Sequence, residues 1–242
     1  MAERLTFASK DGSEVSGVIA LPSYDGAASG PKPRAPSEPT GMDKAPGLVL
    51  IQEWWGLNDH IRGLADLFAQ EGFLTLAPDL YQGKVTADPN EAGQLMQALD
   101  RERALRDIAA ATRFLLAHER CNGKVGVTGF CMGGAFSFSA AALIPELSAA
   151  VPFYGVPPVD KVDYSQVKAP IMAHFASRDH WATVEAAEAI KKQLEAHGQS
   201  MQLHVYDADH AFMNDTRPDV YNPEARKLAW ERTIAFLHGA LG

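Results

Sequence analysis

Residues 124–134, KVGVTGFCMGG, carry the clearest fold signal in the chain. The first five are typical of a buried strand, and the glycines that follow are typical of a sharp turn from a strand into a helix. The turn fits the pattern G-x-C-x-G, in which the nucleophile has a strained backbone and its neighbours must be small. It would place Cys131 at a helix N-terminus, where the helix dipole favours a thiolate over a thiol. Cys131 is therefore the candidate nucleophile, with an inert buried cysteine as the alternative.

The uncharged region around this turn, residues 125–145, is long enough to raise the question of a membrane span. It contains Gly126, Gly129, Gly133 and Gly134, and its hydrophobic pattern changes partway. A buried strand, a turn and a buried helix explain these features better than one membrane helix.

Apolar runs typical of strands alternate with helical patterns along most of the chain. Asn58 and Asp100 are suited to cap two of the helices. Strands that are nearly all apolar, each followed by a helix, predict an α/β fold with a mostly parallel sheet covered on both faces. In such sheets the chemistry lies at the carboxyl ends of the strands. The predicted strands are 15–21, 47–52, 73–77, 124–128, 149–153, 170–176 and 201–206, and two further helices are predicted at 182–197 and 223–238.

Residues 22–46 form a segment of a different composition, with six prolines, three glycines and almost no large apolar side chains. Such a segment cannot bury enough apolar surface to form part of a core, so it is predicted to be a loop. The part of the chain before it is too short to fold alone. We therefore expect a single domain over residues 1–242 with a proline-rich insertion.

The overall composition is that of an ordinary globular protein of 242 residues, with 46% hydrophobic and 21% charged residues. The formal net charge of −8 and the lack of a dense basic run make nucleic acid an unexpected partner. The two cysteines, Cys121 and Cys131, give neither a disulfide framework nor a zinc-binding spacing, so no metal is expected. The charged N-terminus does not resemble a signal peptide, which makes the cytoplasm the expected location. We expect a monomer or a weak homo-oligomer. Its expected partner is a small-molecule substrate, and no membrane binding is expected.

Two more candidate catalytic residues follow predicted strands. Asp179 comes just after the strand at 170–176, and His210 comes just after the strand at 201–206. In this fold class the chain order is nucleophile, acid, histidine, so the three residue types appear in the required order. His180 and Asp209 are rivals for the histidine and acid roles because they stand next to the favoured residues. Cys121 precedes Asn122 and Gly123 in a predicted turn and is interpreted as structural.

The segment after the strand at 47–52 offers the remaining part of a hydrolytic site. An oxyanion hole in this fold takes one N–H from the residue after the nucleophile, here Met132, and one from this earlier loop. The backbone N–H of Trp54 is the candidate for the second donor, and two such donors stabilise developing negative charge. Core packing is the alternative role for the side chains of Trp54 and Trp55.

Together these segments resemble the dienelactone hydrolase (carboxymethylenebutenolidase) family. The resemblance runs from about residue 3 to the C-terminus, interrupted by the proline-rich segment, and it implies an α/β-hydrolase fold. It implies hydrolysis of a lactone or activated ester by a Cys131–His210–Asp179 triad, through a thioester and without a cofactor. It also implies that Glu53 lies beside the thiol and helps to switch it between a neutral and an attacking form; a carboxylate next to a thiol raises the thiol's pKa by repulsion. The resemblance is carried by residues 52–56, 78–81, 129–134, 153–155, 179–180 and 209–212.

The chain departs from the family where substrate is bound. Members that cleave dienelactone hold its carboxylate with basic side chains near the equivalents of Tyr81 and of the segment after His210. Here only Lys84 and Arg217 stand near these positions, and no arginine fork is visible. An aromatic pocket suited to a flat or apolar acyl group is expected. The predicted substrate-binding residues are Trp55, Tyr81, Lys84, Tyr154, Trp181 and Phe212, with Trp54 contributing to the aromatic wall.

Two other classes of function remain open at this point. A thiol redox sensor or oxidoreductase needs a resolving cysteine, and Cys121 would lie at the other end of a strand from Cys131, which makes a direct bridge implausible. A non-catalytic ligand-binding protein on a hydrolase fold is the second alternative, because a fold does not guarantee an activity.

Overall fold

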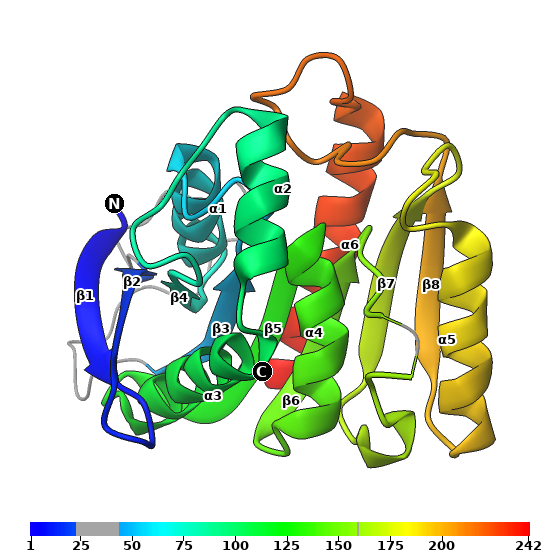
Figure 1. The fold of residues 1–242 in the computed structure, drawn as a ribbon. Helices are drawn as coiled ribbons and strands as arrows, with labels where there is room; N and C mark the ends of the chain where they lie inside the picture. Colours follow the sequence, from blue (N-terminus) through cyan, green and yellow to red (C-terminus); the bar gives the residue numbers. More distant parts are fainter. Residues whose placement is uncertain (23–43, 159) are drawn as a thin grey trace, which may run out of the picture.

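The computed structural model describes residues 1–22, 44–158 and 160–242. These residues form an eight-stranded sheet in the order β1-β2-β4-β3-β5-β6-β7-β8 (Figure 1). β1 and β2 pair antiparallel with each other, β2 also pairs antiparallel with β4, and the other neighbouring strands are parallel. The predicted α/β fold with a mostly parallel sheet is therefore confirmed. The strands are β1 (Glu3–Ala8), β2 (Glu14–Ala20), β3 (Ala45–Ile51), β4 (Leu74–Pro78), β5 (Cys121–Phe130), β6 (Leu147–Phe153), β7 (Ile171–Ala176) and β8 (Met201–Tyr206).

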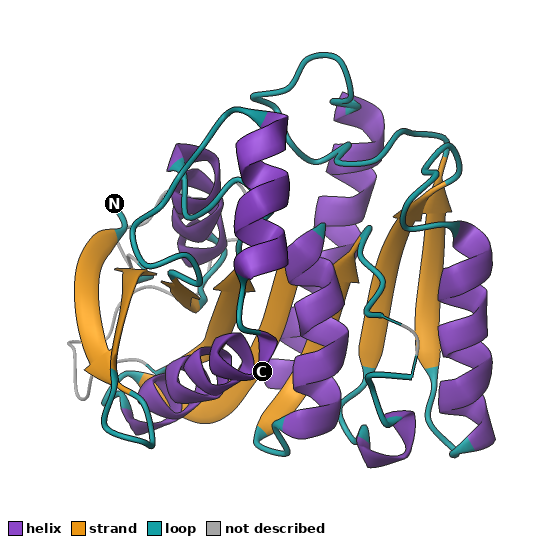
Figure 2. Ribbon diagram, in the orientation of Figure 1, coloured by secondary structure: helices purple, strands orange, loops and turns teal. Residues whose placement is uncertain are grey.

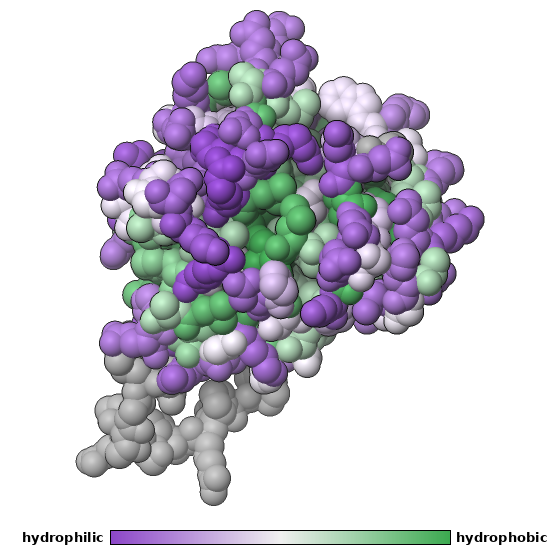
Figure 3. Space-filling view, turned by 60° about the horizontal axis from the view of Figure 1, so that its bottom comes forward, coloured by the Kyte–Doolittle hydropathy of each residue, from purple (hydrophilic) through white to green (hydrophobic). Residues whose placement is uncertain are grey.

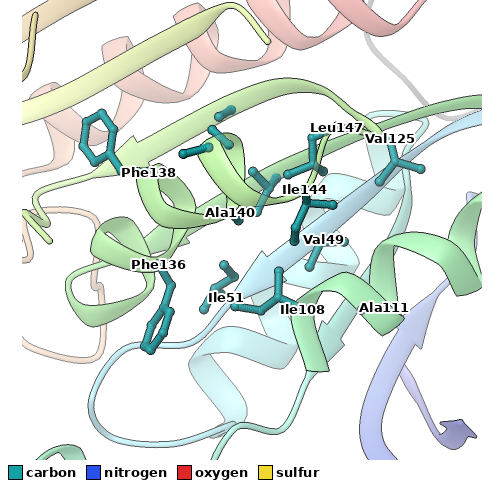
Figure 4. Packing of buried hydrophobic residues seen from close by; sticks show 14 of the residues in the cluster. Val49, Ile51, Ile108, Ala111, Val125, Phe136, Phe138, Ala140, Ile144 and Leu147 are labelled. Atoms are coloured by element: carbon teal, nitrogen blue, oxygen red, sulfur yellow. The ribbon is translucent and has the colours of Figure 1, made fainter. Parts of the chain in front are cut away.

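Helices cover both faces of this sheet (Figures 1 and 2). One apolar cluster joins the sheet to α3 (Arg101–Ala117), α4 (Met132–Leu143) and α5 (Val184–Ala196). A second cluster on the opposite face joins it to α1 (Asp59–Gln70) and α6 (Pro223–Leu241). Figure 4 shows side chains of β3, α3 and α4 meeting in the first cluster, Val49, Ile108 and Phe136 among them. In the tilted view of Figure 3, hydrophilic residues surround an apolar area near the middle of the face.

The predicted helix starts are confirmed. The side chain of Asn58 accepts a hydrogen bond from the backbone N–H of Ile61 at 3.1 Å, and Asp100 caps α3 through the N–H groups of Glu102 and Arg103. These oxygens satisfy backbone donors that the first turn of a helix leaves free.

Three elements of the described part of the chain were not predicted: β1, α2 (Pro89–Ala98) and the short 3-10 helix η1 (Tyr164–Gln166). β1 is mostly exposed, α2 buries only Ala92, and η1 is three residues long. β5 begins at Cys121 rather than at residue 124, so Cys121 lies in the strand and not in a turn, and it is buried.

The region 125–145 folds as predicted, into a buried strand, a turn at Cys131 and the buried helix α4. In the described part of the chain no helix has the length and apolar character that a membrane span needs. Of the expected insertion at 22–46, residues 23–43 lie outside the described residues, and Ala45 and Pro46 already belong to β3.

Candidate active site

Cys131 stands on a strained turn between β5 and α4. Its φ of 56° is in the left-handed region, which is uncommon for a residue other than glycine and costs about 1–3 kcal/mol. The backbone N–H of Cys131 is held by the carbonyl of Phe153 at 3.1 Å, which fixes the turn against β6. A Cβ on Gly129 would lie 2.4 Å from the carbonyl oxygen of Gly133, and one on Gly133 would lie 2.4 Å from that of Ile51. Both glycines are therefore required by close packing, and the sulfur is presented at the N-terminus of α4.

Asp179 and His210 are joined by a short hydrogen bond. Asp179 follows β7, His210 follows β8, and Nδ1 of His210 lies 2.6 Å from Oδ2 of Asp179. The other carboxylate oxygen accepts from the backbone N–H groups of Trp181 and Ala182 at 2.8 and 3.0 Å. Burial raises the pKa of Asp179, but these hydrogen bonds and the charge of His210 outweigh it and hold the pKa below its usual value.

The second ring nitrogen of His210, Nε2, is buried and forms no hydrogen bond with another described residue. It falls short of hydrogen-bond geometry with Cys131, yet the sulfur lies near enough to act on the charge of the ring. Burial lowers the pKa of His210, whereas the hydrogen bond with Asp179 and the nearby Cys131 raise it, to about 10 overall. An imidazolium beside Cys131 is therefore favoured at neutral pH.

The structure separates the favoured residues from their rivals. Arg178 holds the carboxylate of Asp209 through two hydrogen bonds of 3.2 and 3.1 Å, and it also pairs with Asp207. Asp209 is thus engaged away from the imidazole. His180 is exposed at the cavity and forms no hydrogen bond with the carboxylate of Asp179.

Glu53 lies at the same end of the sheet, two residues after β3, and is almost completely buried. Oε2 accepts a hydrogen bond of 2.7 Å from Nδ2 of Asn214, whereas Oε1 has no partner among the described residues. Burial raises the pKa of Glu53, and the charge of His60 and the hydrogen bond from Asn214 oppose that rise only in part. Glu53 is therefore a carboxyl group that takes up a proton more readily than one in water.

Two backbone N–H groups border the site. Met132 is the first residue of α4 and Trp54 lies in the turn after β3, and neither amide donates a hydrogen bond to another described residue. The first N–H groups of a helix have no partner within it, so that of Met132 is available to a ligand.

A cavity of about 390 Å³ lies over these groups and has Cys131 and His210 in its wall. Its aromatic part is a set of three tryptophans: the rings of Trp54 and Trp55 have centroids 5.0 Å apart, and those of Trp54 and Trp181 are 5.8 Å apart. The guanidinium of Arg217 lies over the ring of Trp55, 5.7 Å from its centroid. No group of three or more metal-ligating side chains occurs in the described ranges. The remaining wall residues are Glu53, Pro89, Arg178, Asp179, His180, Asp209, Ala211 and Val220.

The comparisons with known proteins agree on one family. The sequence model of the dienelactone hydrolase family matches residues 35–241. This chain belongs to the dienelactone hydrolase family. Protein usf of Aquifex pyrophilus is 37% identical over 239 residues, which cover 94% of each protein. A carboxymethylenebutenolidase of Pseudomonas putida is 34% identical over 232 residues, 90% of this chain and 94% of that protein.

The fold agrees with this assignment. A dienelactone hydrolase-like promiscuous phosphotriesterase from metagenomic libraries superposes with a TM-score of 0.80 over 100% of this chain and 99% of its own, at 23% identity, which is a likeness of fold. As a member of the dienelactone hydrolase family, the chain is a carboxylic ester hydrolase with the α/β-hydrolase fold, and its substrate is a small molecule.

The structure of this dienelactone hydrolase family member places only two of the six predicted substrate-binding residues, Trp55 and Trp181, in the cavity wall. Tyr81 is buried and its hydroxyl donates to Sδ of Met132 at 3.3 Å, while Lys84 is exposed away from the cavity. Tyr154 and Phe212 are fully buried, with ring centroids 5.3 Å apart.

Tyr154 packs against the imidazole of His210, with the two ring centroids 5.2 Å apart. The cavity wall therefore does not include Tyr81, Lys84, Tyr154 or Phe212, and a role for them in substrate binding stays a prediction. Of the two basic residues considered from the sequence, Arg217 reaches the cavity and Lys84 does not. The sequence analysis did not predict Arg178 as a wall residue, although its position directly before Asp179 pointed to the site. Pro89 and Val220 also line the wall, and nothing in the sequence around them indicated this.

Proposed function

We propose that this dienelactone hydrolase-like enzyme hydrolyses a lactone or another activated carboxylic ester through a thioester on Cys131. The observation that carries the proposal is the pairing of His210 with Asp179, which leaves Nε2 of His210 at the cavity beside Cys131. A nucleophile, a base and a group that orients the base are the parts that covalent hydrolysis needs. Trp54 and Met132 would supply the oxyanion hole through their free N–H groups.

The reaction follows from this arrangement. The thiolate of Cys131 attacks the carbonyl carbon, and the electron pair of the C=O bond moves to oxygen, where the two amides stabilise it. The intermediate collapses with cleavage of the ester C–O bond, and His210 gives its proton to the departing oxygen. A water molecule then loses a proton to His210 and attacks the thioester, and collapse releases the carboxylic acid and returns Cys131. Asp179 keeps the imidazole in the orientation that both proton transfers need.

The sulfur nucleophile limits the choice of ester. A thiolate is itself a good leaving group, so the tetrahedral intermediate proceeds to a thioester only if the departing oxygen leaves readily. We expect kcat/KM for an enol or phenol ester to exceed that for an alkyl ester of the same acid by roughly 100-fold or more, which corresponds to about 3 kcal/mol in the barrier. Steady-state kinetics on such a matched pair measures the ratio. Equal values would argue against collapse of this intermediate as a controlling step.

Glu53 is proposed to act on the thiol through its charge. A carboxylate near a thiol disfavours the thiolate, and the burial of Glu53 makes the neutral form of its carboxyl accessible. We expect Glu53→Gln, which keeps the shape and removes the charge, to shift the pH midpoint of Cys131 alkylation downward by roughly one unit. The rate of iodoacetamide labelling at Cys131, followed by mass spectrometry against pH, gives this midpoint. An unchanged midpoint would reduce Glu53 to a structural neighbour.

The cavity suits a flat, unsaturated acyl group because three tryptophans form much of its wall. Since the family is named for dienelactone and several relatives are named carboxymethylenebutenolidase, a screen of lactones and aryl esters should begin with dienelactone. The wall holds two arginines, Arg178 and Arg217. Arg178 already pairs with Asp207 and Asp209, so Arg217, which donates to Asp219 at 2.8 Å, is the one that would meet a substrate carboxylate.

The geometry also bears on the two alternatives. Cys121 begins β5 and Cys131 follows its end, so roughly 30 Å of extended strand separates them and a direct disulfide has no support. The Asp179–His210 pair beside a strained cysteine favours catalysis over simple ligand binding. Several expectations stay predictions: a cytoplasmic location, a single domain, a monomer or weak homo-oligomer, and the lack of nucleic-acid and membrane partners.

A further inference from the structure

Asn214 lies four residues after His210, in the loop between β8 and α6, and is 1% exposed. Its Nδ2 donates to Oε2 of Glu53 at 2.7 Å. Its Oδ1 accepts from the backbone N–H and the hydroxyl of Thr216, at 3.1 and 2.6 Å. The amide therefore joins the His210 loop to a residue 161 positions earlier in the chain.

The contacts with Thr216 decide which way the amide of Asn214 points. A backbone N–H can only donate a hydrogen bond, so the atom of Asn214 that faces it must be the oxygen. The nitrogen is then left to face Glu53. Asn214 thus offers the carboxyl group a donor and no acceptor, which suits a charged carboxylate better than a proton on Oε2.

The same contact separates the two oxygens of Glu53. Oε2 is occupied by Asn214, and Oε1 is buried without a partner among the described residues. A proton on Glu53 therefore belongs on Oε1. The charged and titratable groups that act on the carboxyl come from several elements: His60 of α1, with His210 and Arg217 from the loop after β8. Tyr154 faces the same interior, where burial and the charges of Glu53 and Cys131 raise its pKa.

We propose that Asn214 is a positioning residue, which holds Glu53 by Oε2 and leaves Oε1 as the oxygen that gains and loses a proton in the site that also contains Cys131. The proposal rests on the role proposed above for Glu53 and extends it: one loop carries His210 and also fixes the second group that governs the thiol. Because the donor from Asn214 favours the charged carboxylate, its loss leaves Glu53 neutral over a wider range of pH. A neutral Glu53 no longer repels the thiolate, so Asn214→Ala should act in the same direction as Glu53→Gln.

The test is a double-mutant cycle of wild type, Asn214→Ala, Glu53→Gln and the double variant. The readout is the pH midpoint of iodoacetamide alkylation at Cys131, measured by mass spectrometry. We expect Asn214→Ala to lower the midpoint by roughly half a unit, less than Glu53→Gln. In the double variant the midpoint should equal that of Glu53→Gln, because the amide then has no charged carboxylate to act on.

An unchanged midpoint in Asn214→Ala would overturn the proposal. So would a shift of the same size in the wild-type and Glu53→Gln backgrounds, because a merely structural role of Asn214 would change stability without depending on the charge of Glu53. Thr216→Val provides a second variant if Asn214→Ala does not fold. It removes the hydroxyl that orients the amide but leaves the backbone N–H in place, so a smaller downward shift is expected, and no shift would contradict the proposal. The proposed function is tested separately, by whether Cys131→Ala abolishes hydrolysis. Alkylation of Cys131 needs no turnover, so the double-mutant cycle can fail while the proposed function stands, and the reverse.

Discussion

Cys131→Ala is expected to lower kcat/KM for an enol lactone by at least about 10⁴-fold, because the covalent route requires the sulfur and the residual activity would come only from binding and the oxyanion hole. The fold should persist. Alanine is smaller than cysteine and keeps a Cβ at a position where φ is already 56°, so the substitution adds no strain to the turn. Hydrolysis of dienelactone and of aryl esters by the purified variant, followed by absorbance, measures the loss.

The chain provides a matched control in Cys121. This cysteine is also free, but it is buried at the start of β5, at the opposite end of the strand from Cys131. Cys121→Ser should retain activity within a factor of about two, since it touches no group of the cavity. Substantial hydrolysis by Cys131→Ala, or a comparable loss in Cys121→Ser, would remove Cys131 from the mechanism.

The placement of the proposed triad was predictable because each member directly follows an apolar strand. In a parallel sheet the carboxyl ends of the strands lie at one edge, so Cys131, Asp179 and His210 had to come near one another. Local sequence could not separate Asp179 from Asp209, because both follow strands and stand beside a histidine. The choice depends on Arg178, whose side chain donates hydrogen bonds to the carboxylate of Asp209, while the carboxylate of Asp179 pairs with the imidazole of His210.

The pocket was less predictable than the triad for a related reason. Tyr154 and Phe212 stand next to the site in the sequence, but their rings are buried in the core, where they pack on each other, and only Tyr154 also contacts the ring of His210. Sequence position gives the neighbourhood of an aromatic residue and not the direction of its side chain. The contact between Asn214 and Glu53 has no local signal at all, because it depends on how two distant loops meet.

Asp179→Asn is expected to lower kcat by roughly 10³- to 10⁴-fold with a small effect on KM. The carboxylate accepts from Nδ1 of His210 at 2.6 Å and from two backbone amides, so it fixes both the tautomer and the direction of the ring. An asparagine that turned its NH₂ toward Nδ1 would force the proton to Nε2, and the imidazole could then no longer accept a proton at the cavity.

The charge of Asp179 adds to this effect. It helps to raise the pKa of His210 to about 10, and a raised pKa means that the imidazolium is stable below that pH. Without the carboxylate this stabilisation falls, so the pKa of His210 should drop, and the imidazolium that gives its proton to the departing oxygen should persist only to a lower pH. A kcat profile against pH with its upper limb moved downward is the expected signature. Asp209→Asn is the control, and we expect it to cost less than about tenfold because its carboxylate serves Arg178; the reverse ranking would assign the acid role to Asp209.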